Sequence, residues 1–384
     1  MRKLHDVIYG TLEFNPIVWR IIDTSKFQRL RHLKQLGLTY QVFPSCNHTR
    51  FEHSVGVCHL AIKWAKRLRD VSNIKLDDRT IQLIGVAGLL HDVGHGPFSH
   101  TFEKCLHEEN IQWKHEDMSI KIVDAIFEEQ EINDKEKEMI KHMIKGKVPK
   151  WDDRTYLYKI VSNSDNGIDV DKFDYLVRDS YYSGISIDFQ PDRIIYNSII
   201  IDNDIHFDRK IAYTLENMYR ARYNLHRHLY THKTSSSYEI FLLEILSKSD
   251  IFSNVNNVDY FLTLDDRILY ILMEENKDIA NKWNNRKHYK EILKQRNLIS
   301  RNTLKRLKSL HLKDYIIKGL VYNFCKDNDD PLKHIKFHTK EKKVFINCDT
   351  VSLRSKNNEE VEVRVFEKKY NKKELEKILT IIGS

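Results

Sequence analysis

Leu89-Leu90-His91-Asp92-Val93-Gly94-His95-Gly96-Pro97-Phe98-Ser99-His100 places three histidines and an aspartate directly after a run of apolar residues. The run, residues 83–90, has no polar side and predicts a buried helix. A buried helix that ends in His-Asp takes two ionisable side chains out of water, which costs free energy. A metal ion or a dense hydrogen-bond network offsets that cost. The glycines and the proline supply backbone freedom and end the helix there. The segment favours a shaped site, although a single such histidine is more often an ordinary core residue.

The composition is that of a soluble globular protein with a modest excess of basic residues. The 384 residues are enough for one large domain with a smaller lobe. Apolar residues make up 41% and charged residues 31% of the chain, which excludes a disordered protein. The 63 Lys and Arg residues exceed the 55 Asp and Glu residues, giving a net charge of +8. That excess suits phosphate-bearing ligands or nucleic acid, but it is also typical of an ordinary solvated surface.

Cysteine usage predicts an intracellular protein of the cytoplasm or the nucleus. The cysteines are widely spaced and odd in number and form no Cys-x-x-Cys pair, so we expect reduced thiols and no zinc ribbon. They are Cys46, Cys58, Cys105, Cys325 and Cys348. The N-terminus leads into no long apolar segment, and no run approaches the length of a membrane span, so no membrane partner is expected.

Hydrophobic periodicity predicts a chain that is mainly α-helical. Residues 7–14 alternate in strand fashion and predict a hairpin before Pro16. Residues 21–36 predict a helix, and residues 40–43 a short strand. A second helix opens at Thr49, and its inward stripe indicates that the first histidine points to the core. The stripe consists of His53, Val57, Leu60, Ala61, Trp64 and Leu68.

The middle of the chain continues with helices. Residues 102–145 hold several helical patterns, and residues 166–179 predict a helix that carries carboxylates, an amine and a phenol on neighbouring faces. That helix is either solvated and charged or part of a site, and its apolar residues leave little of it free of packing. Residues 202–204 predict a tight turn between two strands, and residues 211–250 predict long amphipathic helices.

The composition shifts from about residue 251, where Asn and Lys become more frequent. Shorter helices are expected at 259–275 and 286–312, followed by strand-like alternation within 333–384 and a last lysine-rich helix. We therefore expect a catalytic core with its N-terminal hairpin at residues 1–314 and a smaller α+β C-terminal lobe at residues 315–384.

Three separate predicted helices supply a candidate metal site. His53, the adjacent pair His91-Asp92, and Asp171 give two imidazoles and two carboxylates. That set suits a divalent ion such as Fe, Mn or Zn with positions left open for water and substrate oxygens. Further groups could neutralise phosphates or move protons near neutral pH. They are Arg50, Lys172 and Arg222 for the first role, and His95, His100 and His115 for the second.

At these residues the sequence resembles the HD-domain phosphohydrolases. The segments that carry the resemblance are residues 50–57, 91–100 and 166–172, and within this superfamily the chain is most similar to the deoxynucleoside-triphosphate triphosphohydrolases with a sterile alpha motif ahead of the HD domain. The likeness runs from about Lys3 into the C-terminal lobe, so no sterile alpha motif is expected. It implies a mainly α HD-domain helical phosphohydrolase core that cleaves dNTPs to deoxynucleoside and inorganic triphosphate, with Mg accompanying the substrate triphosphate.

The resemblance also implies roles for individual residues. His53, His91, Asp92 and Asp171 would hold the metal, with His95, His100 and His115 as catalytic residues. The implied substrate contacts are Gln35, Leu36, Arg50, Lys172, Tyr175, Asp179, Arg222 and Tyr230. Tyr230 packed against C2′ would exclude a ribose 2′-hydroxyl by sterics. Two departures concern sugar specificity and the proton network: Thr231 stands where the family has glutamine, and Glu103 where it has aspartate.

Nucleotide-activated oligomers are a further property implied by the family. GTP or dGTP would be the activator, and the active form a dimer or tetramer. The matching residues are Asp23, Gln28 and Arg31 for a guanine nucleotide, and Arg193, His232, Lys233 and Arg296 for a second nucleotide. His5 replaces an asparagine and Ser300 a lysine at these sites.

Two alternatives stand beside the dNTP hydrolase. A nucleic-acid-binding protein would use the same phosphate-neutralising residues, but it has no need of the full metal set. An HD phosphohydrolase acting on another nucleotide would need both the phosphate-neutralising residues and the metal ligands.

Overall fold

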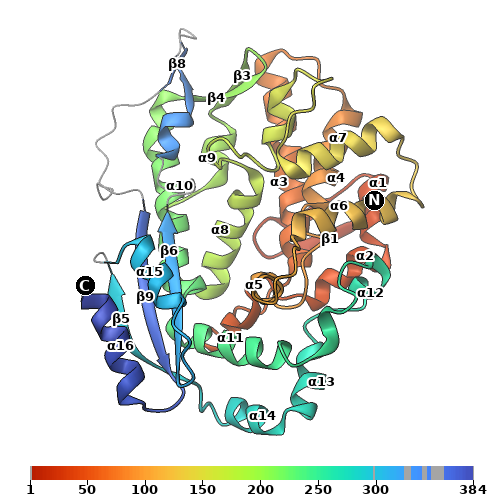
Figure 1. The fold of residues 1–384 in the computed structure, drawn as a ribbon. Coiled ribbons are helices and arrows are strands. Elements are labelled where there is room, and N and C mark those ends of the chain that lie inside the picture. Colours follow the sequence, from red (N-terminus) through yellow and green to blue (C-terminus); the bar gives the residue numbers. More distant parts are fainter. Residues whose placement is uncertain (1, 297–298, 324–329, 340–343, 347–358, 384) are drawn as a thin grey trace.

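The computed structural model describes residues 2–296, 299–323, 330–339, 344–346 and 359–383. Helices form most of the described chain, and short strands make small sheets at its periphery (Figure 1). The mainly α fold expected from the sequence is therefore confirmed. The helices that build the site, α3, α4 and α8, lie side by side near the middle of the molecule.

The described residues form a series of α-helices in chain order. They are α1 (Pro16–Ile22), α2 (Ser25–Gln28), α3 (Arg50–Ser72), α4 (Asp78–Leu90), α5 (His100–Glu108), α6 (His115–Phe127), α7 (Asp134–Lys145), α8 (Val170–Ser183), α9 (Pro191–Ile195), α10 (Ala212–Leu225), α11 (Lys233–Leu246), α12 (Val258–Leu262), α13 (Ile268–Glu275), α14 (Lys277–Asn284), α15 (Arg301–Lys308) and α16 (Lys372–Gly383). Short 3-10 turns join several of them, and one π-helix spans His226–Tyr230.

The strands of the described residues form three sheets. A hairpin pairs β1 (Lys3–Asp6) with β2 (Gly10–Glu13), as predicted. The second sheet has the order β3 (Ser198–Ile201), β4 (Asp204–Asp208), β7 (Lys336–His338) and β8 (Val344–Ile346). The third has the order β5 (Lys290–Arg296), β9 (Glu359–Glu367) and β6 (Tyr315–Asn323), all antiparallel. The predicted turn at residues 202–204 is the β3–β4 connection.

The predicted helix that opens at Thr49 is confirmed as α3. Thr49 and Glu52 form a capping box, in which the Glu52 carboxylate accepts the Thr49 backbone N–H at 2.9 Å. This satisfies N–H groups that a helix start otherwise leaves unpaired. Asn73 ends the helix in the left-handed conformation, with φ of 51°. His53 is fully buried, as the apolar stripe indicates.

α3 packs closely against α4, the predicted buried helix at residues 83–90. The close approach depends on Gly88, because a Cβ there would lie 3.2 Å from the Val57 carbonyl oxygen. The other predicted helical regions, residues 102–145, 166–179 and 211–250, contain α5 to α7, α8, and α10 with α11.

The predicted helix at residues 21–36 is wrong. α1 ends at Ile22, and the Thr24 side chain caps the short helix α2 instead. The chain then extends against residues 48–50, where the Gln35 N–H donates to the His48 carbonyl at 3.0 Å and the Arg50 N–H to the Leu33 carbonyl at 2.9 Å. Tertiary pairing of backbone groups therefore overrides the apolar periodicity of this segment.

Two further secondary-structure predictions are wrong. The predicted strand at 40–43 overlaps a 3-10 turn, Gly37–Gln41. Within the predicted helix at 286–312, residues 290–296 form strand β5 because they pair with β9, and among the described residues of this range only α15 is helical. The last lysine-rich helix is confirmed as α16.

A separate apolar cluster holds the C-terminal sheet together with α15 and α16. It includes Leu304, Leu307, Tyr315, Val363, Val365 and Ile378. In Figure 1 these elements lie at the lower left, beside the green α10 and α11 region. The sheet takes β5 from before residue 315, and β6 and β9 from residue 315 onward. The division into residues 1–314 and 315–384 stays a prediction.

The described cysteines Cys46, Cys58 and Cys105 are free thiols buried in the core, and Cys325 and Cys348 lie outside the described residues. Across the part of the chain that the structure describes, no helix combines the length and apolar character needed to cross a membrane.

Gly56 of α3 is expected to tolerate no side chain. A Cβ at this position would lie 2.0 Å from Oδ1 of Asp174 and 2.5 Å from Nη2 of Arg178. Because breaking a buried ion pair is costly, Gly56→Ala should lower the free energy of unfolding by about 3 kcal/mol. Denaturant unfolding followed by circular dichroism measures the change. Gly383→Ala, where nothing lies within 4 Å of the added Cβ, is the control; an equal effect of both substitutions would contradict this account.

Candidate active site and metal centre

Four predicted ligands converge at the junction of α3, α4 and α8. Nε2 of His53 lies 3.2 Å from Nε2 of His91 and 3.2 Å from Oδ1 of Asp171. His91 Nε2 lies 3.4 Å from Oδ1 of Asp92 and 3.5 Å from Oδ1 of Asp171. His53 lies in the first turn of α3, the pair His91-Asp92 follows the end of α4, and Asp171 lies in the first turn of α8.

The tautomers of the two histidines fit a metal ion. Nδ1 of His53 bonds to the Asp174 carboxylate at 2.8 Å, and Nδ1 of His91 to the Gly88 carbonyl at 2.8 Å. Because both partners are acceptors, each Nδ1 carries a proton, and each Nε2 is the ring atom left to ligate a metal ion, which would take the place of any proton on it. Two imidazole nitrogens and two carboxylates that face one another suit a cation between them. The donor set of nitrogen and oxygen atoms matches a divalent transition metal.

The electrostatics of the cluster show the same demand for positive charge. Burial disfavours a charged His53, but hydrogen bonds to Asp171 and Asp174 outweigh it and raise the pKa of His53 to about 10. Burial opposes ionisation of Asp171, yet the two histidines hold the pKa of that carboxyl far below its ordinary value. Both carboxylates of the set are therefore ionised at neutral pH and available as ligands.

Asp174 is a site residue that the sequence analysis missed. Its carboxylate accepts from His53 and from Arg178, whose Nε and Nη2 each lie 2.9 Å from it. Arg178 also donates to Asp6 of the hairpin at 3.0 Å, and Asp6, Asp174 and Arg178 are all buried. The signal was present in the sequence, because a carboxylate four residues before an arginine on one helix forms such a pair.

A cavity of about 440 Å³ opens beside the metal ligands Asp92 and Asp171. It brings together every predicted catalytic and substrate residue. Its lining consists of Gln35, Leu36, Arg50, Asp92, His95, His100, His115, Asp171, Lys172, Tyr175, Asp179, Arg222, His226 and Tyr230. His226 was not predicted; burial lowers its pKa to about 3, so it lines the cavity as a neutral ring.

Three cations of the cavity have different partners. Arg50 pairs with Asp92 and donates from Nε to Ser99 Oγ at 2.8 Å. Lys172 contacts the Asp169 carboxylate at 2.8 Å. Arg222 donates to the Asn323 carbonyl oxygen at 2.9 Å, which ties it to the end of strand β6. The cavity therefore carries positive charge on several sides of the carboxylate ligands.

A histidine cluster occupies one side of the cavity. The rings of His95 and His115 stack with centroids 4.0 Å apart, and the His100 ring lies 5.3 Å from that of His95. Glu103 joins the cluster, with Oε2 3.0 Å from Nδ1 of His115 and 3.9 Å from Nδ1 of His100.

Three of the four titratable groups in this cluster, His115, Glu103 and His95, have shifted pKa values. Burial disfavours a charged His115, but its hydrogen bond to Glu103 raises the pKa of His115 above its ordinary value. Burial opposes ionisation of Glu103 as well, yet the two histidines lower its pKa to about 2. Burial and Arg50 push the pKa of His95 well below its ordinary value. The cluster thus places a histidine with a raised pKa beside one with a lowered pKa, an arrangement that suits proton transfer.

Asp179 anchors another side of the cavity. Its carboxylate accepts the Tyr230 hydroxyl at 2.6 Å and contacts Nε2 of His48 at 2.8 Å. Near it, the buried Oε1 of Gln35 has no hydrogen-bond partner among the described residues. A buried acceptor without a partner is costly, and a ligand hydroxyl would satisfy it. His48 was not predicted, because only tertiary structure brings it to Asp179.

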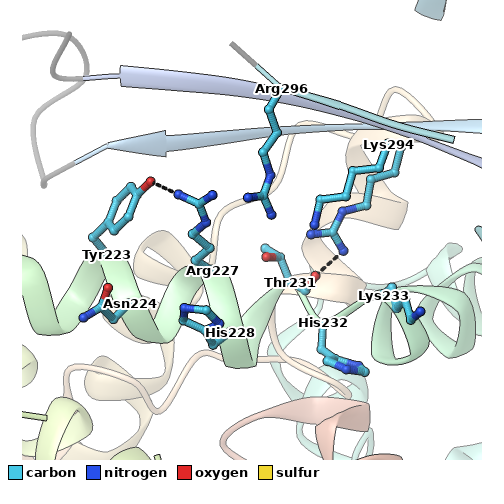
Figure 2. Close-up of a pocket in the computed structure, with 10 residues that line it drawn as sticks. Tyr223, Asn224, Arg227, His228, Thr231, His232, Lys233, Lys294 and Arg296 are labelled. Carbon is cyan, nitrogen blue, oxygen red and sulfur yellow. Dashed lines mark hydrogen bonds between the residues drawn. The ribbon is translucent and has the colours of Figure 1, made fainter. Parts of the chain in front are cut away.

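A second cavity of about 460 Å³ is strongly basic (Figure 2). It lies between the π-helix region and the C-terminal sheet and brings together three of the predicted activator residues, His232, Lys233 and Arg296. We call it the basic pocket; its other lining residues are Tyr223, Asn224, Arg227, His228, Thr231, Lys294 and Arg364. Figure 2 shows Lys294 and Arg296 reaching down from the strands toward Thr231 and Arg227.

Arg193 is not among the residues that line the basic pocket. It lies on α9 and donates to the Thr214 hydroxyl at 2.8 Å. Ser300, which replaces the family lysine, caps α15 by accepting the Thr303 N–H at 3.0 Å.

The other predicted activator residues lie near α2. Arg31 donates to the Gln28 side chain at 2.8 Å and stacks on Phe51, whereas Asp23 pairs with Arg2 at the surface. His5 lies in β1 opposite Thr11.

Comparison with known proteins agrees with this geometry. The family model of the HD domain matches residues 50–179, the segment that begins with α3 and ends within α8, so fold and site define an HD-domain protein. A Dictyostelium discoideum protein named deoxynucleoside triphosphate triphosphohydrolase SAMHD1 homolog is 36% identical, over 88% of this chain and 71% of its own length. The chain belongs to this SAMHD1 family of HD-domain proteins.

Two other relatives are covered over less of their own length. An HD domain-containing protein of Acanthamoeba polyphaga mimivirus is 40% identical, over 69% of this chain and 63% of that protein. The Gallus gallus deoxynucleoside triphosphate triphosphohydrolase SAMHD1 is 35% identical, over 66% of this chain and 46% of that protein.

Changing His91 and Asp92 together to alanine should abolish metal binding and leave a folded protein. The double variant removes two of four ligands, and metal affinity depends on the complete set. Elemental analysis of the purified protein measures the metal, and circular dichroism the fold. Asp174→Asn keeps all four ligands and should weaken binding by about 10- to 100-fold, because it removes the carboxylate that orients His53 and pairs with Arg178. Full metal occupancy in the double variant would disprove the assignment.

Proposed function

We propose that this protein is a metal-dependent deoxynucleoside-triphosphate triphosphohydrolase, which cleaves a dNTP to a deoxynucleoside and inorganic triphosphate. The observation that carries the proposal is that the metal ligands open into one cavity that also holds three cations and a histidine cluster. The printed names of the relatives support the same substrate class. A pure nucleic-acid-binding protein would have no use for the buried ligand set.

His53, His91, Asp92 and Asp171 would hold the metal. A divalent ion bound there, Fe, Mn or Zn, supplies Lewis-acid activation of a water molecule and neutralises phosphate charge. A Mg ion would accompany the substrate triphosphate, since Mg is bound mainly through phosphate oxygens.

Arg50, Lys172 and Arg222 would bind the triphosphate, with the Tyr175 hydroxyl as a further donor. A substrate phosphate would compete with the present partners of these cations, Asp92, Asp169 and the Asn323 carbonyl oxygen. Guanidinium groups suit this task because they donate two parallel hydrogen bonds to phosphate oxygens.

The histidine cluster would protonate the leaving group. When water attacks the α-phosphorus, the bond to the sugar 5′-oxygen breaks, and a sugar alkoxide is a very poor leaving group without a proton. His100 begins α5 beside the cavity and would give this proton, while His115 and Glu103 supply the next groups of a relay. The neutral His95 would orient phosphate oxygens and the attacking water. Attack at the γ-phosphorus would leave the cluster without a task.

Deoxyribose recognition would depend on Gln35, Asp179 and Tyr230. The unpaired Oε1 of Gln35 and the Asp179 carboxylate are acceptors for the 3′-hydroxyl. Tyr230, held by its hydrogen bond to Asp179, would pack against C2′ and leave no room for a ribose 2′-hydroxyl. Leu36 would contact the base or sugar as an apolar wall.

Product analysis tests the function. Incubated with each dNTP and NTP, the purified protein is expected to release deoxynucleoside and intact triphosphate from dNTPs. His100→Ala should lower kcat by about 100-fold or more while the metal stays bound, the usual scale for losing a general acid. Release of dNDP and orthophosphate by the wild-type protein would refute both the attack at the α-phosphorus and the role of His100.

We further propose that a nucleotide activator, GTP or dGTP together with a dNTP, promotes assembly of a dimer or tetramer. The support is the basic pocket, where Lys233, Lys294, Arg296 and neighbouring cations surround a cavity large enough for phosphates. Asp23, Gln28 and Arg31 would read the guanine base, and Arg193 would approach the second nucleotide from another subunit.

Light scattering coupled to size-exclusion chromatography tests this activation. The wild-type mass should rise when GTP or dGTP and a dNTP are added, and Lys233→Ala should raise the activator concentration required by about tenfold. Lys248→Ala, an exposed lysine just beyond α11, should leave that concentration unchanged. An unchanged wild-type mass at saturating nucleotide would contradict activation without affecting the catalytic proposal.

A further inference from the structure

The connection between α12 and α13 reaches two loops of the active site. Asp266 in this connection accepts two backbone hydrogen bonds, from the Phe98 N–H at 2.7 Å and from the Lys34 N–H at 2.8 Å. Its own N–H donates to the His32 carbonyl at 3.2 Å. Burial raises the pKa of Asp266 to about 6, so the carboxyl is mostly ionised at neutral pH and accepts both bonds.

Arg29 strengthens the same connection from the other side. Its Nε donates to the Leu264 carbonyl at 2.8 Å, and its Nη2 to the His95 carbonyl at 2.9 Å. The guanidinium lies 4.7 Å from the centroid of the Phe261 ring. Burial lowers the pKa of Arg29 to about 10, which still leaves the group charged at neutral pH. A buried arginine therefore joins the α12–α13 connection to the backbone of a catalytic histidine.

The loop that Asp266 holds contains a strained backbone. Phe98 and Ser99 have φ values of 56° and 55°, a conformation that residues other than glycine rarely adopt. Such strain persists only where surrounding contacts hold the chain in place. His100 follows directly, and Ser99 Oγ accepts from Arg50. The position of the proposed general acid is thus set by a turn that is unfavourable on its own.

The second loop that Asp266 holds carries Gln35 and Leu36. It packs against the strained turn, because a Cβ on Gly37 would lie only 3.3 Å from the Phe98 carbonyl oxygen. One carboxylate therefore holds the loop expected to bind the sugar and the loop expected to protonate the leaving group at a fixed distance from each other.

We infer that Asp266, with Arg29, is a positioning residue for catalysis: it touches no substrate, and it fixes the Gln35–Leu36 loop relative to the Phe98–His100 turn. The inference rests on the proposed function, since those two loops matter for turnover only if they bind the sugar and the leaving oxygen. Their attachment to Asp266 is testable without any substrate.

Hydrogen–deuterium exchange tests the attachment. In Asp266→Ala, peptides that contain Lys34 and Phe98 should exchange at least about tenfold faster, because both amides lose a bond to a charged acceptor. Asp266→Asn keeps one acceptor oxygen and places an N–H donor against the other amide, so only one of the two peptides should respond strongly. Asp265→Ala is the matched control: the side-chain hydrogen bonds described for the neighbouring carboxylate go to the exposed Arg267. Equal exchange in Asp265→Ala and Asp266→Ala would overturn the inference.

Steady-state kinetics test the consequence for catalysis. Asp266→Ala should lower kcat/KM for a dNTP by about 10- to 100-fold, since small displacements of catalytic groups have effects of that size. It should also reduce the preference for a dNTP over its 2′,3′-dideoxy analogue, which lacks the 3′-hydroxyl that Gln35 would bind. A general loss of stability would lower turnover of both substrates and leave that ratio unchanged, and an unchanged ratio refutes the positioning role.

The two failures are distinguishable. If the wild-type protein released no triphosphate while the exchange pattern followed the Asp266 variants as described, the proposed function would be wrong and the attachment of the loops correct. If the wild-type protein hydrolysed dNTPs and Asp266→Ala matched Asp265→Ala in both measurements, the positioning role alone would be wrong.

Discussion

The hydrogen bond between His53 and the buried Asp174 carboxylate is the contact on which the rest of the site depends. It fixes the tautomer of His53, so that Nε2 faces the other metal ligands. It also connects α3 to α8, and through Arg178 it reaches Asp6 in the N-terminal hairpin. Buried carboxylates outnumber the arginine in this network, and that imbalance is tolerable only beside a positive charge. Folding of the hairpin, the choice of glycine at position 56 and metal binding are therefore coupled.

The same charge distribution suits an anionic substrate. The carboxylates of Asp92 and Asp171 line the cavity together with three cations, Arg50, Lys172 and Arg222. An anionic ligand entering this cavity gains those cations without displacing the ligand set. The histidine cluster occupies a third side, where Glu103 raises the pKa of His115 and burial lowers the pKa of His95. The cations and the histidine cluster are thus spatially separated within one cavity.

Sequence patterns predicted the parts of this site that lie on regular helices. The apolar stripe of α3 placed His53 inward, and the all-apolar α4 placed His-Asp at its buried end, as the structure has them. The prediction of one helix over residues 21–36 was wrong, because backbone pairing with residues 48–50 takes the place of helical hydrogen bonds at the end of this segment. Asp266 and Arg29 could not be found from the sequence, because their partners are backbone groups distant in the chain. A carboxylate that accepts main-chain N–H groups leaves no pattern in side-chain types.

The π-helix at His226–Tyr230 gives both cavities a common wall. His226 and Tyr230 line the catalytic cavity, whereas Arg227 and His228, which lie between them in the chain, line the basic pocket. The wide turn of a π-helix is typical of functional sites, and here four of its five residues line the two cavities. Arg364 of strand β9 donates to the Thr231 carbonyl, and Arg222 donates to Asn323 of strand β6. Because the C-terminal sheet holds a residue on each side of this wall, the basic pocket and the catalytic cavity share the backbone that carries Tyr230.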